Sequence, residues 1–361
     1  RDRAQDQIIE TVLAFIEADD ASENAFNGLA LDLFAHQFEN NKPFRQFSMC
    51  RERTPRTTKT WHEIPAVPIS AFKDLRLSCS TPHETPHTFM TSGTTMAAKR
   101  GKSHHSTLAV YDASMKTNFQ HRFMSDRDTI RMGILFPDEN VMPNSSLAHY
   151  LALALRHFGA PNSQYMWHQD GIDFVSVLAE LEHAETTGEP YALLGASSSF
   201  VHLTDEMRRH GKSVALPVGS RILDTGGFKG QSREVELDDF YSQLSTHLGV
   251  PRRQCINMYG MTELSTQFYD WGNETCPSVK SGPHWIRSRV INPLTGRDIP
   301  PGAPGVLVHC DLAHFNITTT ILTEDAGIKT EAGFILLGRA DGSDAKGCSM
   351  VVEEFLKAAD G

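Results

Sequence analysis

The 361-residue chain lacks any apolar run close to the roughly 18 residues that a membrane-spanning helix requires. Its longest apolar stretches, such as residues 150–155, have the length of core elements. An excess of basic residues is also missing, because 34 lysines and arginines stand against 44 aspartates and glutamates, a formal net charge of −10. That balance argues against the basic footprint of non-specific nucleic-acid binding. We therefore expect neither a membrane span nor a nucleic-acid partner.

Cysteine pairs of the kind that bind metals are absent as well. The six cysteines lie at positions 50, 79, 255, 276, 310 and 348, and none forms a CxxC pair. No group of His, Cys and Asp has the spacing of a metal site. A disulfide scaffold is not expected in a chain of this length, so the cysteines are expected to be reduced thiols of a cytoplasmic protein. The first six residues lack the apolar segment of a secretory signal.

Hydrophobic spacing changes twice along the chain. In the first forty residues, apolar side chains recur at helical spacing. From about residue 130, short apolar strands alternate with capped helices, for example in residues 130–136 and 147–158, which is typical of an α/β sheet with helices on its faces. Glycine, proline and short strands predominate towards the end. We predict an α/β core with N-terminal helices over residues 1–275, and a smaller β-rich subdomain over residues 276–337.

One loop rich in small hydroxylated residues is a candidate phosphate-binding loop. Hydroxyls around a glycine let backbone N–H groups and side chains converge on a phosphate. Positive charge follows at Lys99, Arg100 and Lys102. The alternative is a polar surface turn, since the Walker A pattern is absent. The loop consists of Thr91, Ser92, Gly93, Thr94 and Thr95.

Two further loops follow predicted strands, where α/β sheets usually bind ligands. In the first, adjacent glycines allow a flat ligand to approach the backbone, or form an ordinary strand-to-helix turn. The second combines an aromatic ring, a glycine, a hydroxyl and a carboxylate, which suits base stacking, a phosphate contact and Mg²⁺ binding through Glu263. A strand end with a threonine N-cap is the alternative for any one residue. The residues are Thr225, Gly226 and Gly227, then Tyr259, Gly260, Met261, Thr262 and Glu263.

In this order, the three loops resemble the signatures of the adenylate-forming superfamily, which includes acyl-CoA synthetases, aryl-CoA ligases and peptide-synthetase adenylation domains. The first signature reads TSGTTMAAK here, with Met96 in the place of a glycine. The second, YGxTE, is intact as YGMTE. Downstream, the resemblance extends to Asp325, which it implies to hold the ribose hydroxyls of ATP, and to Gly338-Arg339, which it implies to adjoin a small C-terminal domain.

Other segments resemble one branch of that superfamily, the acyl-protein synthetases of the LuxE type. They are IPAVPISAFK at residues 64–73, TGGFKG at 225–230 and GCS at 347–349. The resemblance implies an α/β large domain with mixed sheets flanked by helices, a β-rich C-terminal part, and a truncated or absent small domain. Residues 338–361 are then a short C-terminal segment after the Gly-Arg hinge. In that branch a cysteine near the C-terminus accepts the acyl group, which implies Cys348, presented by a bend at Gly347.

The resemblance implies an ATP-dependent ligase that activates a carboxylic acid, a fatty acid in the LuxE branch, as acyl-AMP. Loop 91–95, with Mg²⁺ held by Glu263, is expected to stabilise the charge that develops at the α-phosphate. Tyr259 and the 225–227 loop are expected to position adenine. Lys229 is expected to face the phosphates or the acyl carboxylate, and Arg339 the ribose or a phosphate.

Two alternative functions remain open from the sequence. The first is a ligase that delivers acyl groups to CoA or to the phosphopantetheine of a carrier protein. The second is a non-catalytic nucleotide-binding or scaffold subunit, which Met96 and the short C-terminal segment favour. The expected partners are the acid and ATP, together with an acyl-CoA-reductase-like or acyl-carrier protein.

Overall fold

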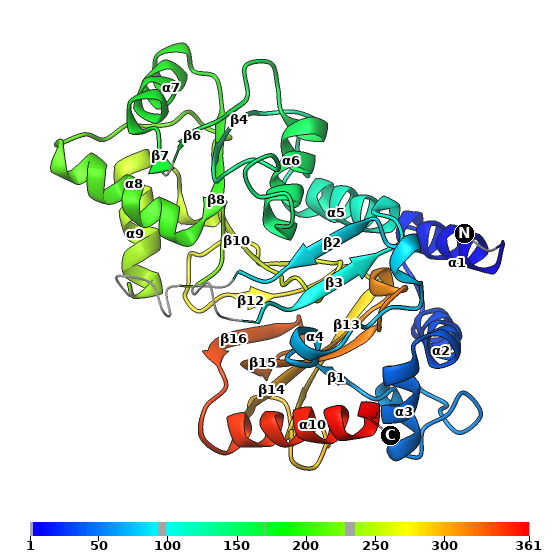
Figure 1. The fold of residues 1–361 in the computed structure, drawn as a ribbon. Helices are drawn as coiled ribbons and strands as arrows, with labels where there is room; N and C mark the ends of the chain where they lie inside the picture. Colours follow the sequence, from blue (N-terminus) through cyan, green and yellow to red (C-terminus); the bar gives the residue numbers. More distant parts are fainter. Residues whose placement is uncertain (1–2, 93–98, 170, 228–234, 361) are drawn as a thin grey trace. The chain divides into compact units, whose positions relative to one another are not determined.

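The computed structural model describes residues 3–92, 99–169, 171–227 and 235–360 (Figure 1). The chain forms two compact units. Unit 1 comprises Arg1–Thr117, Met261–Gln267 and Ser281–Gly361, and unit 2 comprises Asn118–Gly260 and Phe268–Lys280. These units cut across the continuous ranges expected from the sequence, because the N-terminal helices join the C-terminal strands instead of the α/β core.

Unit 1 is built on an antiparallel sheet of C-terminal strands. Its strand order is β16-β15-β14-β13, and the short β1 pairs in parallel with β15, so that Val67 lies opposite Ile321. The strands are β1 (Val67–Pro68), β13 (Ile286–Ile291), β14 (Pro304–Asp311), β15 (Thr320–Lys329) and β16 (Phe334–Arg339). A separate hairpin pairs β2 (His87–Met90) with β3 (Lys102–His105).

The N-terminal helices belong to unit 1 because their polar side chains satisfy the backbone before β15. Gln37 donates to the Phe315 carbonyl at 2.8 Å, and Asn41 donates to the Ile317 carbonyl at 2.9 Å. Asn41 is also the N-cap of α3. The helices and 3₁₀ turns of unit 1 are α1 (Arg3–Glu17), α2 (Glu23–Asn40), α3 (Lys42–Cys50), η1 (Trp61–Glu63), α4 (Ala71–Asp74), η2 (Pro82–Glu84), η4 (Leu312–His314) and α10 (Gly342–Asp360), and α5 (Ala109–Arg122) begins there.

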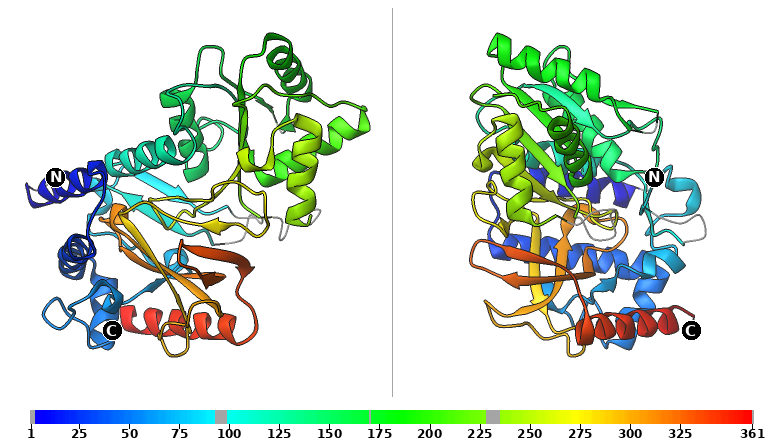
Figure 2. Two further views of the ribbon diagram at one scale, coloured as in Figure 1. Left: turned by 180° about the vertical axis from the view of Figure 1, so that it is seen from behind. Right: turned by 90° about the vertical axis from the view of Figure 1, so that its left-hand side faces the viewer.

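The C-terminal segment is a helix, α10, that packs beside α3 (Figures 1 and 2). The rings of Phe47 and Phe355 lie 4.7 Å apart between their centroids, and Arg51 pairs with Glu354 at 2.5 Å. The prediction of a bend at Gly347 is wrong, because this residue lies inside the helix α10. A Cβ there would come within 2.8 Å of Cγ of Pro293, so the glycine permits close packing of α10.

Unit 2 has the parallel sheet that the strand–helix alternation predicts. Its strand order is β11-β10-β9-β8-β4-β5, and all neighbours are parallel except β10 and β11. The strands are β4 (Arg131–Leu135), β5 (Gln164–Tyr165), β8 (Tyr191–Ala196), β9 (Arg221–Thr225), β10 (Cys255–Tyr259) and β11 (Phe268–Tyr269), with β6 (Trp167–His168), β7 (Gly171–Ile172) and β12 (Val279–Lys280) outside that order. The helices are α6 (Ser146–Phe158), α7 (Phe174–Thr187), α8 (Ser197–Arg209), α9 (Leu237–Leu248) and the 3₁₀ turn η3 (Arg252–Gln254).

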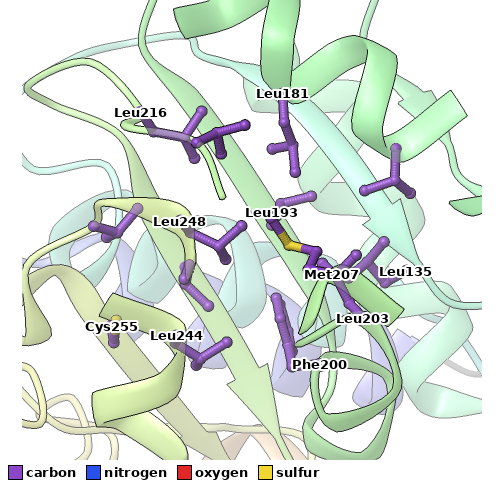
Figure 3. Packing of buried hydrophobic residues seen from close by; sticks show 14 of the residues in the cluster. Leu135, Leu181, Leu193, Phe200, Leu203, Met207, Leu216, Leu244, Leu248 and Cys255 are labelled. Atoms are coloured by element: carbon purple, nitrogen blue, oxygen red, sulfur yellow. The ribbon is translucent and has the colours of Figure 1, made fainter. Parts of the chain in front are cut away.

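Three helices of unit 2 bury their apolar sides against the sheet (Figure 3). Leu181 of α7, Met207 of α8 and Leu248 of α9 meet Leu193 of the central strand β8. Every residue of β4 and β9 is buried, as is typical of parallel strands covered by helices. Among the residues described, no helix has the length and apolar character needed to cross a membrane.

Candidate active site

The β2–β3 hairpin holds the two ends of the candidate phosphate loop. The Thr91 amide donates to the Gly101 carbonyl at 3.0 Å, and the Gly101 amide donates to Oγ1 of Thr91 at 2.9 Å. Ser92 is exposed beside them. Of the predicted loop residues, Gly93, Thr94 and Thr95 lie outside the described residues, as does Lys229.

The structure brings Glu263 of the YGMTE motif to this hairpin. A Cβ built on Gly101 would lie 3.1 Å from Oε1 of Glu263 and 3.1 Å from Cγ2 of Thr91. Glycine at position 101 therefore leaves the space that the carboxylate occupies. Glu263 is only 5% exposed, and this burial raises the pKa of its carboxyl to about 7, against the opposing effect of its own backbone N–H and of the positive charges on Arg339 and Lys73.

A buried aspartate that the sequence analysis missed fixes the backbone after Glu263. Oδ2 of Asp311, at the end of β14, accepts hydrogen bonds from the amides of Ser265 at 2.8 Å and Thr266 at 2.9 Å. Its Oδ1 accepts from Oγ1 of Thr266 at 2.7 Å. Burial raises the pKa of Asp311 to about 6, although these donors favour the ionised form. Locally, Asp311 only caps the 3₁₀ turn η4 through the amide of Ala313, and no local motif marks its second role, because Ser265 and Thr266 lie more than forty positions away.

The predicted pair Asp325 and Arg339 also meets in unit 1. The two residues face each other across the β15–β16 pairing, with Nη1 of Arg339 3.6 Å from Oδ1 of Asp325. The same nitrogen lies 3.4 Å from Oε2 of Glu324. Ser70, in the IPAVPISAFK segment, donates a hydrogen bond to the other oxygen of Glu324. Two carboxylates and one guanidinium thus share the end of this strand pair.

Cys348 lies in α10 close to that group of charges. Its Sγ is 3.8 Å from the carbonyl oxygen of Thr323, and the residue is 4% exposed. Burial, together with the negative charges of Glu324 and Asp344, raises the pKa of the thiol to about 11. The structure therefore places the predicted acceptor beside the Asp325 strand, in a helix that keeps the thiol buried and protonated.

Unit 2 brings the other two motif segments together. Thr225, which ends β9, lies opposite Met258 of β10 and donates from Oγ1 to the Met258 carbonyl at 2.9 Å. Gly226 then has a φ of 93°, a left-handed conformation that favours glycine. Tyr259 packs on Phe268 with ring centroids 5.9 Å apart. The YGMTE motif is divided, since Tyr259 and Gly260 belong to unit 2 and the last three residues to unit 1.

A buried polar network supports these strand ends, and the sequence analysis did not find it. Asp224 accepts hydrogen bonds from Ser197 at 2.6 Å, Tyr241 at 2.9 Å and the side chain of Asn257 at 2.9 Å. Burial raises the pKa of Asp224 to about 6. The network ties the carboxyl ends of β8, β9 and β10 together through side chains from three separate parts of the chain.

Within the described part of the chain, no three or more His, Cys, Asp or Glu side chains gather as a metal site. Glu263 nevertheless suits Mg²⁺, which proteins usually bind through one or two carboxylates together with substrate phosphates and water. Its oxygen lies beside Gly101, which pairs with Thr91 at the start of the candidate phosphate loop. The donor set fits a magnesium ion that arrives with a nucleotide, and does not resemble a closed protein cage.

Comparison with known proteins gives one family over nearly the whole chain. The family described as acyl-protein synthetase, LuxE, matches residues 3–357. Two curated proteins, both named long-chain-fatty-acid–luciferin-component ligase, are similar. The one from Vibrio harveyi is 23% identical over 336 residues, 90% of this chain and 86% of its own. The one from Aliivibrio fischeri is 23% identical over 310 residues, which are 84% of this chain and 79% of its own.

Solved structures resemble this chain as well. An open conformation of 2-hydroxyisobutyryl-CoA ligase, in complex with 2-HIB-AMP and CoA, has a TM-score of 0.65 and 12% identity over 88% of this chain and 69% of that chain. At this identity the likeness concerns the fold, and it confirms the α/β fold class predicted from the sequence.

Proposed function

The chain belongs to the acyl-protein synthetase (LuxE) family, and on that basis we propose that it is an ATP-dependent ligase that activates a long-chain fatty acid and transfers the acyl group to a protein thiol. The carboxylate oxygen attacks the α-phosphorus of ATP, and the bond to the bridging oxygen breaks, so that pyrophosphate leaves with the electron pair. A thiolate sulfur then attacks the carbonyl carbon of acyl-AMP and AMP leaves. The observation that carries the proposal is the family match over residues 3–357, joined to the meeting of Glu263 and Thr91 at Gly101.

Residues of unit 1 are proposed to manage the charge of the first step. Glu263 would hold Mg²⁺, which would supply positive charge against the negative charge that develops in the transition state. Thr91 and Ser92 are proposed to contribute hydroxyls to the phosphates, and the proposal extends to Gly93, Thr94 and Thr95. Thr262 lies next to the carboxylate in the same motif and is buried. Lys229 is proposed to face the phosphates or the acyl carboxylate.

Residues of unit 2 are proposed to hold the adenine. Gly226 and Gly227 are exposed at the end of β9, where the absence of side chains leaves the backbone open to a flat ring. Tyr259 and Gly260 end the neighbouring strand β10. The polar network around Asp224 supports this proposal, because it keeps the two strand ends in a defined register before any ligand binds.

We expect Asp325→Ala to weaken ATP binding more than it slows chemistry. A carboxylate that binds the ribose acts in both the ground state and the transition state, so the loss should appear as an increase of about tenfold in the KM for ATP with little change in kcat. Steady-state ATP–pyrophosphate exchange measures both. Asp298→Ala, which removes an exposed partner of Arg289, is the control. An ATP affinity equal to that of the parent would make Asp325 a partner of Arg339 only.

The pH dependence of the reaction should depend on magnesium. With a raised pKa of about 7, Glu263 carries a proton at lower pH and loses its affinity for a cation. At limiting Mg²⁺ we expect exchange activity to fall as the pH drops through about 7, and at saturating Mg²⁺ we expect the midpoint to move to lower pH, because metal and proton compete for one carboxylate. A midpoint that does not move with Mg²⁺ concentration would remove Glu263 from metal binding.

The acyl acceptor defines a second candidate function. The burial of Cys348 in α10 favours a free thiol, such as CoA or the phosphopantetheine of a carrier protein, as long as that helix stays in place. An acyl-CoA-reductase-like protein or an acyl-carrier protein is then the proposed partner. The six cysteines form no disulfide, which supports the cytoplasm as the proposed compartment.

One experiment separates these functions. The protein is incubated with MgATP and a panel of fatty acids of different length, with and without CoA, and pyrophosphate release and intact mass are measured. A mass increase equal to the acyl group identifies a protein thioester, whereas acyl-CoA in solution identifies the alternative acceptor. A nucleotide-binding scaffold would release no pyrophosphate with any acid.

A further inference from the structure

The short helix α4 lies in the IPAVPISAFK segment, to which the proposed function assigns no role. The two residues that precede this helix are attached to β15. The Ile69 amide donates to the Leu322 carbonyl at 3.0 Å, which extends the β1–β15 pairing, and Ser70 donates to Oε1 of Glu324. The helix therefore begins beside Glu324, next in sequence to the proposed ribose ligand.

The other side of α4 lies against the phosphate-loop hairpin. A Cβ on Gly101 would lie 3.6 Å from Cβ of Phe72, and the same position would lie 3.1 Å from Oε1 of Glu263. Asp74 pairs with Lys99, just after the loop, at 2.6 Å. All these contacts are within unit 1. α4 and the residues before it therefore contact three parts of unit 1. These are the strand β15 that carries Glu324, Gly101 beside Glu263, and Lys99 just after the phosphate loop.

Lys73 lies in α4 between Phe72 and Asp74, two of the residues through which the helix is attached. Its side chain is exposed, and among the described residues its ammonium makes no ion pair or hydrogen bond. Two other cations of this region are already paired, Arg339 with Glu324 and Asp325, and Lys99 with Asp74. An exposed, unpaired lysine is ordinarily a solvated surface residue. Here the contacts of its helix with β15 and with the phosphate-loop hairpin hold the backbone of Lys73 beside the motif residues.

We propose that Lys73 is a catalytic residue that binds an anionic oxygen of the adenylation reaction, on an ATP phosphate or on the attacking carboxylate. The inference rests on the proposed function. The first step brings together two anions, and a cation that is not already neutralised by a protein carboxylate reduces their repulsion most effectively. Lys73 and Arg339 both hold the pKa of Glu263 below the value that burial alone would give, which agrees with a position close to that carboxylate.

The test compares Lys73→Met, Lys73→Arg and the parent in ATP–pyrophosphate exchange. Methionine keeps much of the apolar stem and removes the charge. We expect Lys73→Met to lower kcat/KM by about 10- to 100-fold, and Lys73→Arg to recover most of that loss. Lys59→Met is the matched control and should match the parent, since Lys59 is also an exposed lysine of unit 1 and its backbone bonds to Asn27 and Glu63, which lie outside the motifs.

Calorimetry with MgATP alone identifies which oxygen Lys73 binds. A phosphate contact weakens MgATP binding in Lys73→Met, whereas a carboxylate contact leaves that binding unchanged and raises the KM for the acid. The proposal is overturned if Lys73→Met has the melting temperature of the parent, its affinity for MgATP and its KM for the acid. Should methionine impair folding, Lys73→Gln is measured in its place.

The two proposals fail differently. If the parent exchanges pyrophosphate and both Lys73→Met and Lys73→Gln match it, the proposed function stands and the inference about Lys73 is overturned. If the parent shows no exchange with any acid, the proposed function is overturned. The affinities of the parent and of Lys73→Met for MgATP then decide whether the lysine contacts a phosphate. If the parent binds no MgATP either, both proposals are overturned.

Discussion

Glu263→Gln should lower ATP–pyrophosphate exchange by about a hundredfold or more, because it removes the charge proposed to bind Mg²⁺ and so several kcal/mol of transition-state stabilisation. Exchange is measured at several Mg²⁺ concentrations, so that a loss of metal affinity is distinguished from a loss of rate. Glu331→Gln is the control, since Glu331 is an exposed acid in the turn between β15 and β16 of the same unit.

The same substitution should not destabilise the fold. The folded-state pKa of Glu263, about 7, lies above the ordinary value of 4.5, so folding favours the protonated form, and as the pH rises above 4.5 the burial of the charge increasingly costs stability. Above pH 7 that cost is complete, and a neutral glutamine should leave the melting temperature equal or higher at pH 8. A folded Glu263→Gln protein with parent exchange at every Mg²⁺ concentration would contradict the metal assignment.

Cys348→Ser is expected to form acyl-AMP at the parent rate and to carry no hydroxylamine-sensitive acyl group. A thiolate forms the thioester, and serine offers no comparable nucleophile at neutral pH. Because burial raises the pKa of the parent thiol to about 11, self-acylation of the parent should also accelerate with increasing pH. Intact mass before and after hydroxylamine measures the adduct. The control Cys50→Ser, which replaces an exposed thiol of α3, should still carry the acyl adduct.

Two results would reassign the acceptor. A thioester that persists in Cys348→Ser places the acyl group on another cysteine of the chain. A parent that stays unmodified with every acid, but acylates CoA, moves the acceptor to a separate molecule and makes the burial of Cys348 in α10 a structural feature.

The sequence determined the parallel sheet of unit 2 and the motif segments. Strand and helix signals there are local, since short, mostly apolar strands such as β4 alternate with helices that carry caps, and each strand pairs with others from the same stretch of chain. The meeting of Thr225 and Tyr259 follows from the adjacency of β9 and β10. Family membership, too, could be inferred from short motifs, because nucleotide chemistry restricts the residue types and their order.

Only the tertiary structure decided which distant segments share a unit. Pairing of Val67 with Ile321, and hydrogen bonds from Gln37 and Asn41 to the backbone before β15, join positions separated by more than 250 residues, and no local pattern announces such contacts. Asp311 and Lys73 gain their significance in the same way, from neighbours remote in sequence. At Gly347 a local rule misled, because glycine permits either a bend or close helix packing, and the position of Pro293 selects the packing.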